Sequence, residues 1–127
     1  MKPLLPIVLA LITLSCNSQK RIEKTGIKSI DFGYGGGVTG AIHQYNLHPN
    51  GDLELGDSAI NSIKNKQTYE LFRQAGRLMD YRFNQPGNMY SFIRINSETS
   101  NYISWSRGDS QIDQSVIDLF NKLNTLK

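Results

Sequence analysis

The sequence has little cysteine and no long apolar run. Only one of its 127 residues is cysteine, which excludes an internal disulfide, a CxxC redox pair and a zinc site built from several cysteines. The longest apolar run, residues 4–14, is shorter than the roughly 20 residues that a transmembrane helix needs. A strict repeat and a long polar tract are also missing, which excludes a solenoid and a wholly disordered chain. One compact domain is therefore expected.

A strong excess of one charge is missing as well. The chain has 14 Lys and Arg residues against 11 Asp and Glu residues, a formal net charge of +3. Nucleic-acid binding requires a much more basic profile. We therefore expect no nucleic-acid partner.

No ordered catalytic motif is present. Ser91, Ser104 and Ser106 lie outside any nucleophile elbow. His43 and His48 are five residues apart, which places them on opposite faces of one strand and identifies no metal site. These absences predict a protein without enzymatic activity, metal or cofactor.

Residues 35–40 spell G-x-G-x-x-G, the fingerprint of dinucleotide-binding loops. That fingerprint requires a helix after the loop, so that the helix N-terminus meets a pyrophosphate. Here the following residues, up to residue 47, alternate like a strand. The pattern predicts a glycine-rich hairpin loop, or a loop kept free of side chains so that another backbone can approach it closely.

The N-terminus has the order of a secretory signal: Lys2, the apolar run 4–14, and Ser15 before Cys16. Residues 13–16 resemble the bacterial lipobox, in which a small residue precedes a cysteine that is lipidated and becomes the mature N-terminus. The resemblance implies a lipoprotein signal peptide at residues 1–15 and attached acyl chains, such as palmitate, at Cys16. Each buried CH₂ group contributes about 0.8 kcal/mol, so several chains would hold the protein on a membrane.

Residues 16–26 are polar and show no apolar period, so we expect a flexible tether after the lipid. The alternative is a basic patch for anionic lipid or nucleic acid. Its positive charge comes from Lys20, Arg21 and Lys24 and is reduced by Glu23.

The residue after the cysteine is Asn17 and not aspartate. By resemblance to lipoprotein sorting in enteric bacteria, this favours the outer membrane. The predicted location is the cell envelope of a Gram-negative bacterium, with the membrane as a partner through the N-terminal lipid.

Two spacings predict the elements of the remaining chain, residues 27–127. Alternation of apolar and polar residues predicts strands, and apolar spacings of three and four predict amphipathic helices. The strands are expected over 30–34, 39–47, 53–55, 89–96 and 102–106, and the helices over 65–79 and 112–126, the second opened by a capping box from Ser110 to Asp113. The order βββαββα predicts one α+β domain, an antiparallel sheet of about five strands with two helices on one face.

Two loops of unusual composition form the candidate binding surface. The first is rich in glycine, and the second is a polar turn that combines a rigid Pro-Gly pair with contact groups. The candidate residues are Gly35, Gly36 and Gly37 in the first loop and Asn84, Pro86, Gly87, Asn88 and Tyr90 in the second. In the absence of a catalytic motif, we expect a non-enzymatic domain that binds a protein or peptide through these loops.

The same segments resemble small lipoproteins of Gram-negative envelopes. The resemblance spans most of the mature chain and implies no activity. It is carried by residues 32–40 (FGYGGGVTG), Tyr45 with Leu47, the Asn50-Gly51 turn and residues 86–90 (PGNMY). The layout is also distantly similar to emfourin, a small inhibitor of thermolysin-type metalloproteases, through Gly36, Gly37, Gly40 and the order of elements. This similarity implies protease inhibition as a narrower form of the binding hypothesis.

Other classes of function stay open. His43, Trp105 and Asp31 could line a cleft, which would make the domain a small-ligand-binding protein or an unrecognised hydrolase. A structural component of the envelope is a further alternative. An aromatic ligand platform is also conceivable, although packing in the core and across strands is the more common use of such residues. The platform would consist of Trp105, Tyr102, Tyr90 and Phe92.

Overall fold

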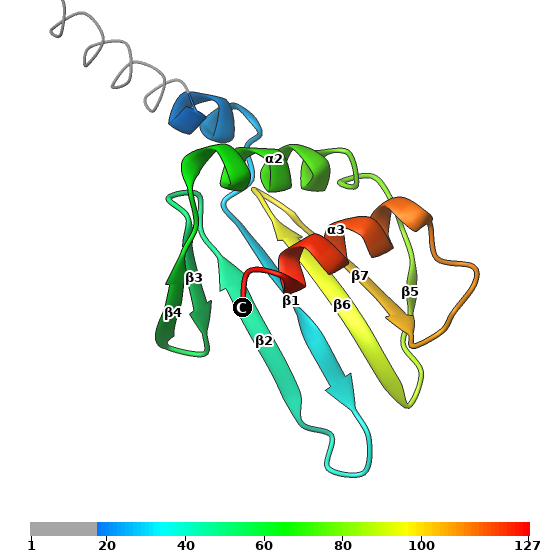
Figure 1. The fold of residues 1–127 in the computed structure, drawn as a ribbon. Helices are drawn as coiled ribbons and strands as arrows, with labels where there is room; N and C mark the ends of the chain where they lie inside the picture. The colour runs from blue at the N-terminus through cyan, green and yellow to red at the C-terminus, as the bar shows by residue number, and fades with distance from the viewer. Residues whose placement is uncertain (1–17) are drawn as a thin grey trace, which may run out of the picture.

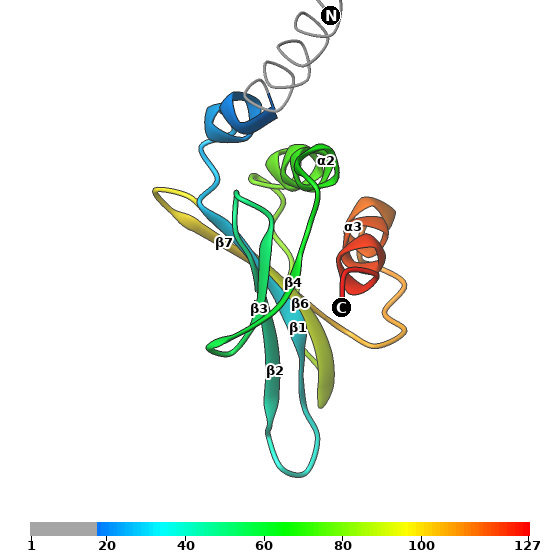
Figure 2. The same ribbon diagram turned by 60° about the vertical axis from the view of Figure 1, so that its left-hand side comes forward.

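The computed structural model describes residues 18–127. The predicted signal peptide, residues 1–15, and the predicted lipidation site, Cys16, lie outside the described residues. In the described part, two helices lie on one face of a mixed sheet (Figures 1 and 2). The elements are β1 Ser29–Gly36, β2 Ile42–Leu47, β3 Asp52–Leu55, β4 Ser58–Ser62, α2 Asn65–Gly76, β5 Asn84–Gln85, β6 Met89–Asn96, β7 Ser100–Ser106 and α3 Gln114–Asn124.

The seven strands of the described residues lie in the order β4-β3-β2-β1-β6-β7-β5. The central strand β1 pairs antiparallel with β2 on one side and with β6 on the other. Ile30 and Phe32 of β1 are fully buried, as are their cross-strand partners on β6. Because side chains alternate along a strand, these residues give the sheet one apolar face, which α2 and α3 cover.

Each of the two helices contributes a stripe of buried apolar side chains to the core. The spacing of three and four residues puts the stripe on one side of the helix. The buried residues are Leu71, Phe72 and Ala75 on α2 and Val116, Leu119 and Leu123 on α3. The two predicted helices are confirmed but shorter, and α2 ends at Gly76. The capping box expected from Ser110 is wrong, because α3 is capped by Asp113, whose carboxylate accepts a hydrogen bond from the N–H of Ser115.

The predicted α+β class with helices on one face is confirmed, but the sheet is larger and mixed. The sequence pattern misses β4, because all five of its residues are exposed and show no apolar alternation. It also misses β5, which has two residues and lies in the segment expected to be a turn. β5 pairs parallel with β7, so the prediction of a five-stranded, wholly antiparallel sheet is wrong.

The N-terminal segment differs from the expected flexible tether in its described part. Residues 18–24 are helical, and the side chain of Ile22 is fully buried in the core. Gln19 Nε2 donates a hydrogen bond to Asn65 Oδ1 at 2.8 Å, and the Arg21 guanidinium lies 5.7 Å from the centre of the Tyr69 ring. These contacts attach the segment, called here the N-terminal helix, to α2.

No helix in residues 18–127 is long and apolar enough to cross a membrane.

The elements define two ends of the molecule. The N-terminal helix and α2 lie at the top in Figure 1, whereas the β1–β2 loop lies at the bottom. Figure 2 shows the same arrangement after rotation, with the β1–β2 hairpin extending away from both helices. The candidate binding loops are therefore far from the point where the described chain begins.

Candidate functional site

The structure brings the two predicted loops together. Gly35 and Gly36 at the end of β1 pair with Tyr90 and Met89 at the start of β6, and the N–H of Gly37 donates a hydrogen bond to the Asn88 carbonyl oxygen at 2.8 Å. Gly35, Gly36 and Gly37 therefore lie beside Asn88 and Tyr90, whereas Asn84 lies on β5 beside β7, where its side-chain oxygen accepts a hydrogen bond from Ser104 Oγ. This end of the sheet, residues 35–42 and 84–90, is called here the loop end.

Contacts within the chain restrict three of the loop-end glycines, most strictly Gly36. Gly36 has φ +93°, and a Cβ atom there would lie 1.9 Å from the Asn88 carbonyl oxygen. A Cβ atom on Gly35 would lie 2.7 Å from the Tyr90 hydroxyl, and one on Gly87 would lie 2.3 Å from Ser106 Oγ. Both expectations for the glycine-rich loop are confirmed. Residues 37–41 join the antiparallel strands β1 and β2 as a hairpin loop, and at Gly36 another backbone segment of the same chain approaches closely.

Beyond these contacts, the loop end presents apolar side chains to solvent. Val38 is fully exposed, and the exposed fractions of Ile42 and Met89 are 60% and 48%. Segments 32–51 and 83–93, which include this surface, contain no Lys, Arg, Asp or Glu. Beside the two loops, the N–H of Arg107 donates a hydrogen bond to the Met89 carbonyl oxygen at 3.3 Å. Uncharged segments with exposed Met and aliphatic side chains, next to an arginine, are typical of the centre of a protein–protein interface.

The aromatic residues considered as a platform are divided between the two faces of the sheet. Trp105 lies on the covered face, is 4% exposed, and packs edge-on against Phe120 at 5.1 Å between ring centres. Tyr90, Phe92 and Tyr102 lie on the opposite face, because they alternate with the buried isoleucines of their strands. Trp105 is therefore a core residue and does not join the other three rings.

Packing on the face away from the helices affects one titratable group. Phe92 contacts Tyr102 at 5.7 Å between ring centres, and the Arg94 guanidinium lies 5.0 Å above the Tyr102 ring. Burial raises the pKa of the Tyr102 hydroxyl above its usual value, while the nearby cation of Arg94 acts in the opposite direction. Tyr102 is therefore a neutral hydroxyl at physiological pH.

The three residues proposed to line a cleft do not converge. Asp31 lies on the face away from the helices, where its carboxylate accepts a hydrogen bond from Asn96 Nδ2 at 2.9 Å and lies 3.8 Å from Arg94. Trp105 lies on the covered face, and His43 stacks on Tyr34 at 4.8 Å between ring centres. The sheet separates the carboxylate from the indole, so these residues form no common ligand or hydrolytic site.

The histidines also differ in their surroundings. His48 lies 3.3 Å from the Glu54 carboxylate, whereas His43 lies further along β2 beside Tyr34. Within residues 18–127, no group of three or more His, Cys, Asp or Glu side chains is arranged to hold a metal ion.

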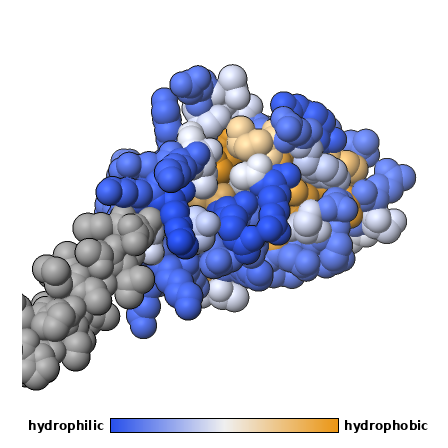
Figure 3. All heavy atoms as spheres, turned by 90° about the horizontal axis from the view of Figure 1, so that it is seen from above, coloured by the Kyte–Doolittle hydropathy of each residue, from blue (hydrophilic) through white to orange (hydrophobic). Residues whose placement is uncertain are grey.

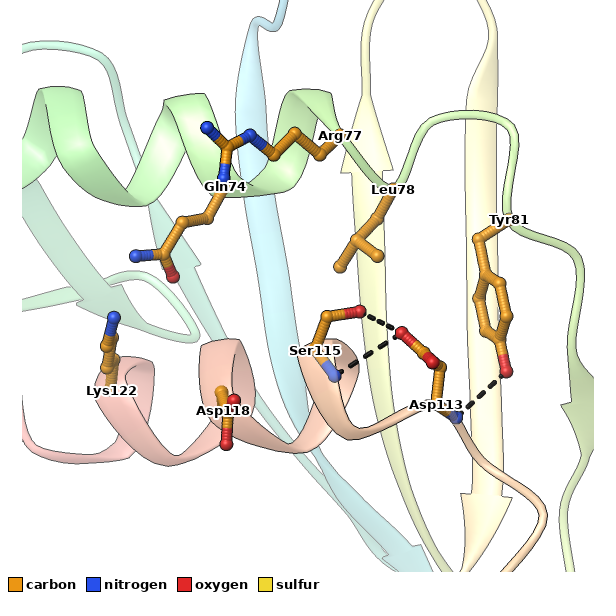
Figure 4. Close-up of a pocket in the computed structure, with 8 residues that line it drawn as sticks. All are labelled: Gln74, Arg77, Leu78, Tyr81, Asp113, Ser115, Asp118 and Lys122. Carbon is orange, nitrogen blue, oxygen red and sulfur yellow. Dashed lines mark hydrogen bonds between the residues drawn. The ribbon is translucent and has the colours of Figure 1, made fainter.

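A groove that the sequence does not indicate lies between α2 and α3, with a volume of about 470 Å³ (Figure 4). Gln74 lines it from α2 and Lys122 from α3. Ser115 donates a hydrogen bond to the Asp113 carboxylate, and the N–H of Asp113 donates to the Tyr81 hydroxyl at 3.0 Å. These bonds fix the start of α3, and the residues lining the groove include no histidine or cysteine to activate Ser115 as a nucleophile.

Comparison with known proteins does not place this chain in a family. No protein-family model matches the chain, and no curated protein or solved structure shows a significant match to it. The resemblances noted from the sequence therefore stay predictions, and the candidate function rests on the residues of the loop end.

Proposed function

We propose that this chain is a non-enzymatic lipoprotein of a Gram-negative envelope and that its α+β domain binds a protein or peptide partner through the loop end. The observation that carries the proposal is the meeting of two uncharged loops, which together expose Val38, Ile42 and Met89. Exposing an apolar side chain to water is unfavourable by roughly 25 cal/mol per Å², so covering this surface with a partner would stabilise a complex.

The position of the loop end supports the same proposal. A lipid on Cys16 would attach the chain two residues before the first described residue, at the top of the molecule in Figure 1. The loop end lies at the bottom, so an anchored domain would present it away from the anchor. A partner in the periplasm or at the cell surface would then reach the loop end without meeting the lipid.

Protease inhibition is a narrower form of this function. Val38 stands fully exposed between Gly37 and Gly40, which both have positive φ. Such a loop can insert one apolar side chain into a pocket on the partner. The specificity pocket of a protease binds a single side chain in this way. The aliphatic side chain at residue 38 would then be the group that the protease binds.

The lipid anchor is tested by metabolic labelling. We expect the wild-type chain to incorporate an alkyne fatty acid and to fractionate with the envelope, because residues 13–16 resemble a lipobox. The Cys16→Ala chain is expected to lose the label completely. An unlabelled, soluble wild-type protein would contradict the anchor and would direct the search to free periplasmic or secreted partners.

Partner binding is tested by site-specific photo-crosslinking in the host cell. With a photoreactive residue at position 38 or 89, we expect one discrete adduct of higher mass. Ile60 on β4 is the matched control, because it is an exposed aliphatic residue, 43% accessible, that lies outside the loop end. We expect Ile42→Asp to weaken the adduct formed from position 89 by about 100-fold, since a buried, unpaired carboxylate costs several kcal/mol and each 1.4 kcal/mol is tenfold.

The outcomes of this experiment separate the hypotheses. Equal yields of adduct from positions 38 and 60 would show that the loop end is not a specific binding surface. If the adduct contains a protease, the purified chain should inhibit that protease, and Val38→Asp should abolish inhibition. A purified protease that stays fully active with saturating chain would exclude the inhibitor form.

A further inference from the structure

The basic residues are distributed unevenly over the described chain. Segments 18–28 and 64–77 together contain eight Lys and Arg residues but only two acidic residues, Glu23 and Glu70. The rest of the described chain contains five basic and nine acidic residues. Two short segments, which form the N-terminal helix and α2 with their flanking residues, therefore carry an excess of positive charge although the whole chain is nearly balanced.

These two segments are far apart in the sequence and adjacent in the structure. The hydrogen bond from Gln19 to Asn65 and the contact of Arg21 with Tyr69 place the N-terminal helix against α2. The combined surface is called here the basic face. It consists of Lys20, Arg21, Lys24, Lys28, Lys64, Lys66, Arg73 and Arg77.

The cations of α2 point away from the core. Lys66, Arg73 and Arg77 are seven and four residues apart, which places them on one side of the helix. The buried residues of α2, such as Leu71 and Ala75, lie on the other side. Viewed from the end that carries the N-terminal helix and α2, the described surface is mainly hydrophilic, with apolar side chains visible in gaps (Figure 3).

Most of this positive charge is not compensated within the described chain. Glu70 forms an ion pair with Arg73 at 2.7 Å, and this hydrogen bond, with the nearby cations, lowers the pKa of the Glu70 carboxyl below its usual value. Glu70 therefore stays ionised and offsets Arg73. The ion pairs found in residues 18–127 involve none of the other cations of the basic face, so an excess of exposed positive charge remains.

We propose that the basic face binds the surface of a bilayer that contains anionic phospholipids. The charge of the face is complementary to such a surface, and near the membrane each Lys or Arg strengthens binding by about fivefold. The described chain begins on this face, two residues after Cys16, so the lipid and the cations would meet the membrane together. Because several acyl chains would already hold the protein on the membrane, the cations would act on its orientation.

This contact would also fix the orientation of the domain. A lipid alone tethers the protein but leaves it free to tilt. With the basic face against the headgroups, the β1–β2 loop points away from the bilayer, because the two lie at opposite ends of the molecule. The inference thus deepens the proposed function, since it assigns the direction in which the loop end meets a partner.

The test measures vesicle binding of the full chain carrying Cys16→Ala, so that no attached lipid contributes. Binding to vesicles with about 30 mol% phosphatidylglycerol is compared with binding to vesicles of phosphatidylcholine alone. Because phosphatidylcholine has no net charge, binding to the second vesicles measures the contribution of the apolar run 4–14. The test variant is K20Q/K24Q/K66Q. The matched control is R94Q/R107Q/K127Q, which removes the same charge outside the basic face.

We expect the test variant to lose about 100-fold in partition onto the anionic vesicles and the control less than about threefold. Added salt should reduce the binding of the parent chain, since screening weakens the attraction. Equal losses in both variants, or equal binding to both vesicle types, would overturn the proposal. Stronger binding to heparin than to vesicles would assign the face to an acidic macromolecule and would also overturn it. None of these vesicle or heparin results affects fatty-acid labelling or crosslinking. The membrane-binding proposal and the proposed function can therefore be refuted independently of each other.

Discussion

Replacing Gly36 by alanine is expected to lower the free energy of unfolding by about 3 kcal/mol. Gly36 has φ +93°, a conformation that destabilises an L-residue by about 1–2 kcal/mol. In addition, the new Cβ atom would lie 1.9 Å from the Asn88 carbonyl oxygen, so the two strands must separate, and such overpacking typically destabilises by about 1–3 kcal/mol. Urea denaturation of the two full chains, followed by circular dichroism, measures the difference.

Gly37→Ala is the matched control for this prediction. Gly37 has φ +81°, but a Cβ atom there would meet nothing within 4 Å. Only the conformational penalty applies, so we expect a loss of about 1 kcal/mol. If both variants lose the same stability, the contact between Gly36 and Asn88 does not hold the two loops together. The crosslinking signal from position 89 should fall in Gly36→Ala, because the same contact aligns the loops.

The central elements of the fold could be predicted because their residues alternate or repeat with the helical period. In β1, Ile30, Phe32 and Tyr34 alternate with Asp31 and Gly33, and α3 places its apolar residues three and four positions apart. Both patterns arise because one face of each element is buried against the other layer. The α+β class follows from them without knowledge of strand pairing.

The elements that could not be predicted lack such a pattern for physical reasons. β4 lies at the sheet edge with both of its faces exposed, so its sequence is not constrained to alternate. β5 depends on long-range hydrogen bonds, among them one from the N–H of Ser104 to the Phe83 carbonyl oxygen at 3.0 Å. Interactions of this kind leave no signal in the local sequence.

The candidate surfaces show the same division. The glycines and the Pro-Gly turn are visible as unusual composition, but the pairing of Gly36 with Met89 that joins them depends on the register of β1 and β6. The basic face is less visible still. In the sequence, the charge of Glu23 partly offsets that of Lys20 and Lys24. The cations near residue 66 join them on one surface only because the N-terminal helix packs on α2.

The packing of the N-terminal helix gives the second large prediction, since Ile22→Ala is expected to destabilise the domain by about 3 kcal/mol. Ile22 is fully buried, and truncating a buried isoleucine removes apolar contacts and leaves a cavity. The neighbouring Glu23→Ala is the control, and we expect a change below about 0.5 kcal/mol because its side chain is exposed. Urea midpoints with an unchanged dependence on denaturant would report these differences. If Ile22→Ala matches the control, residues 18–24 behave as a tether after all. The predicted loss would instead mean that the basic residues of this helix are held in fixed positions against α2, which the membrane-facing orientation requires.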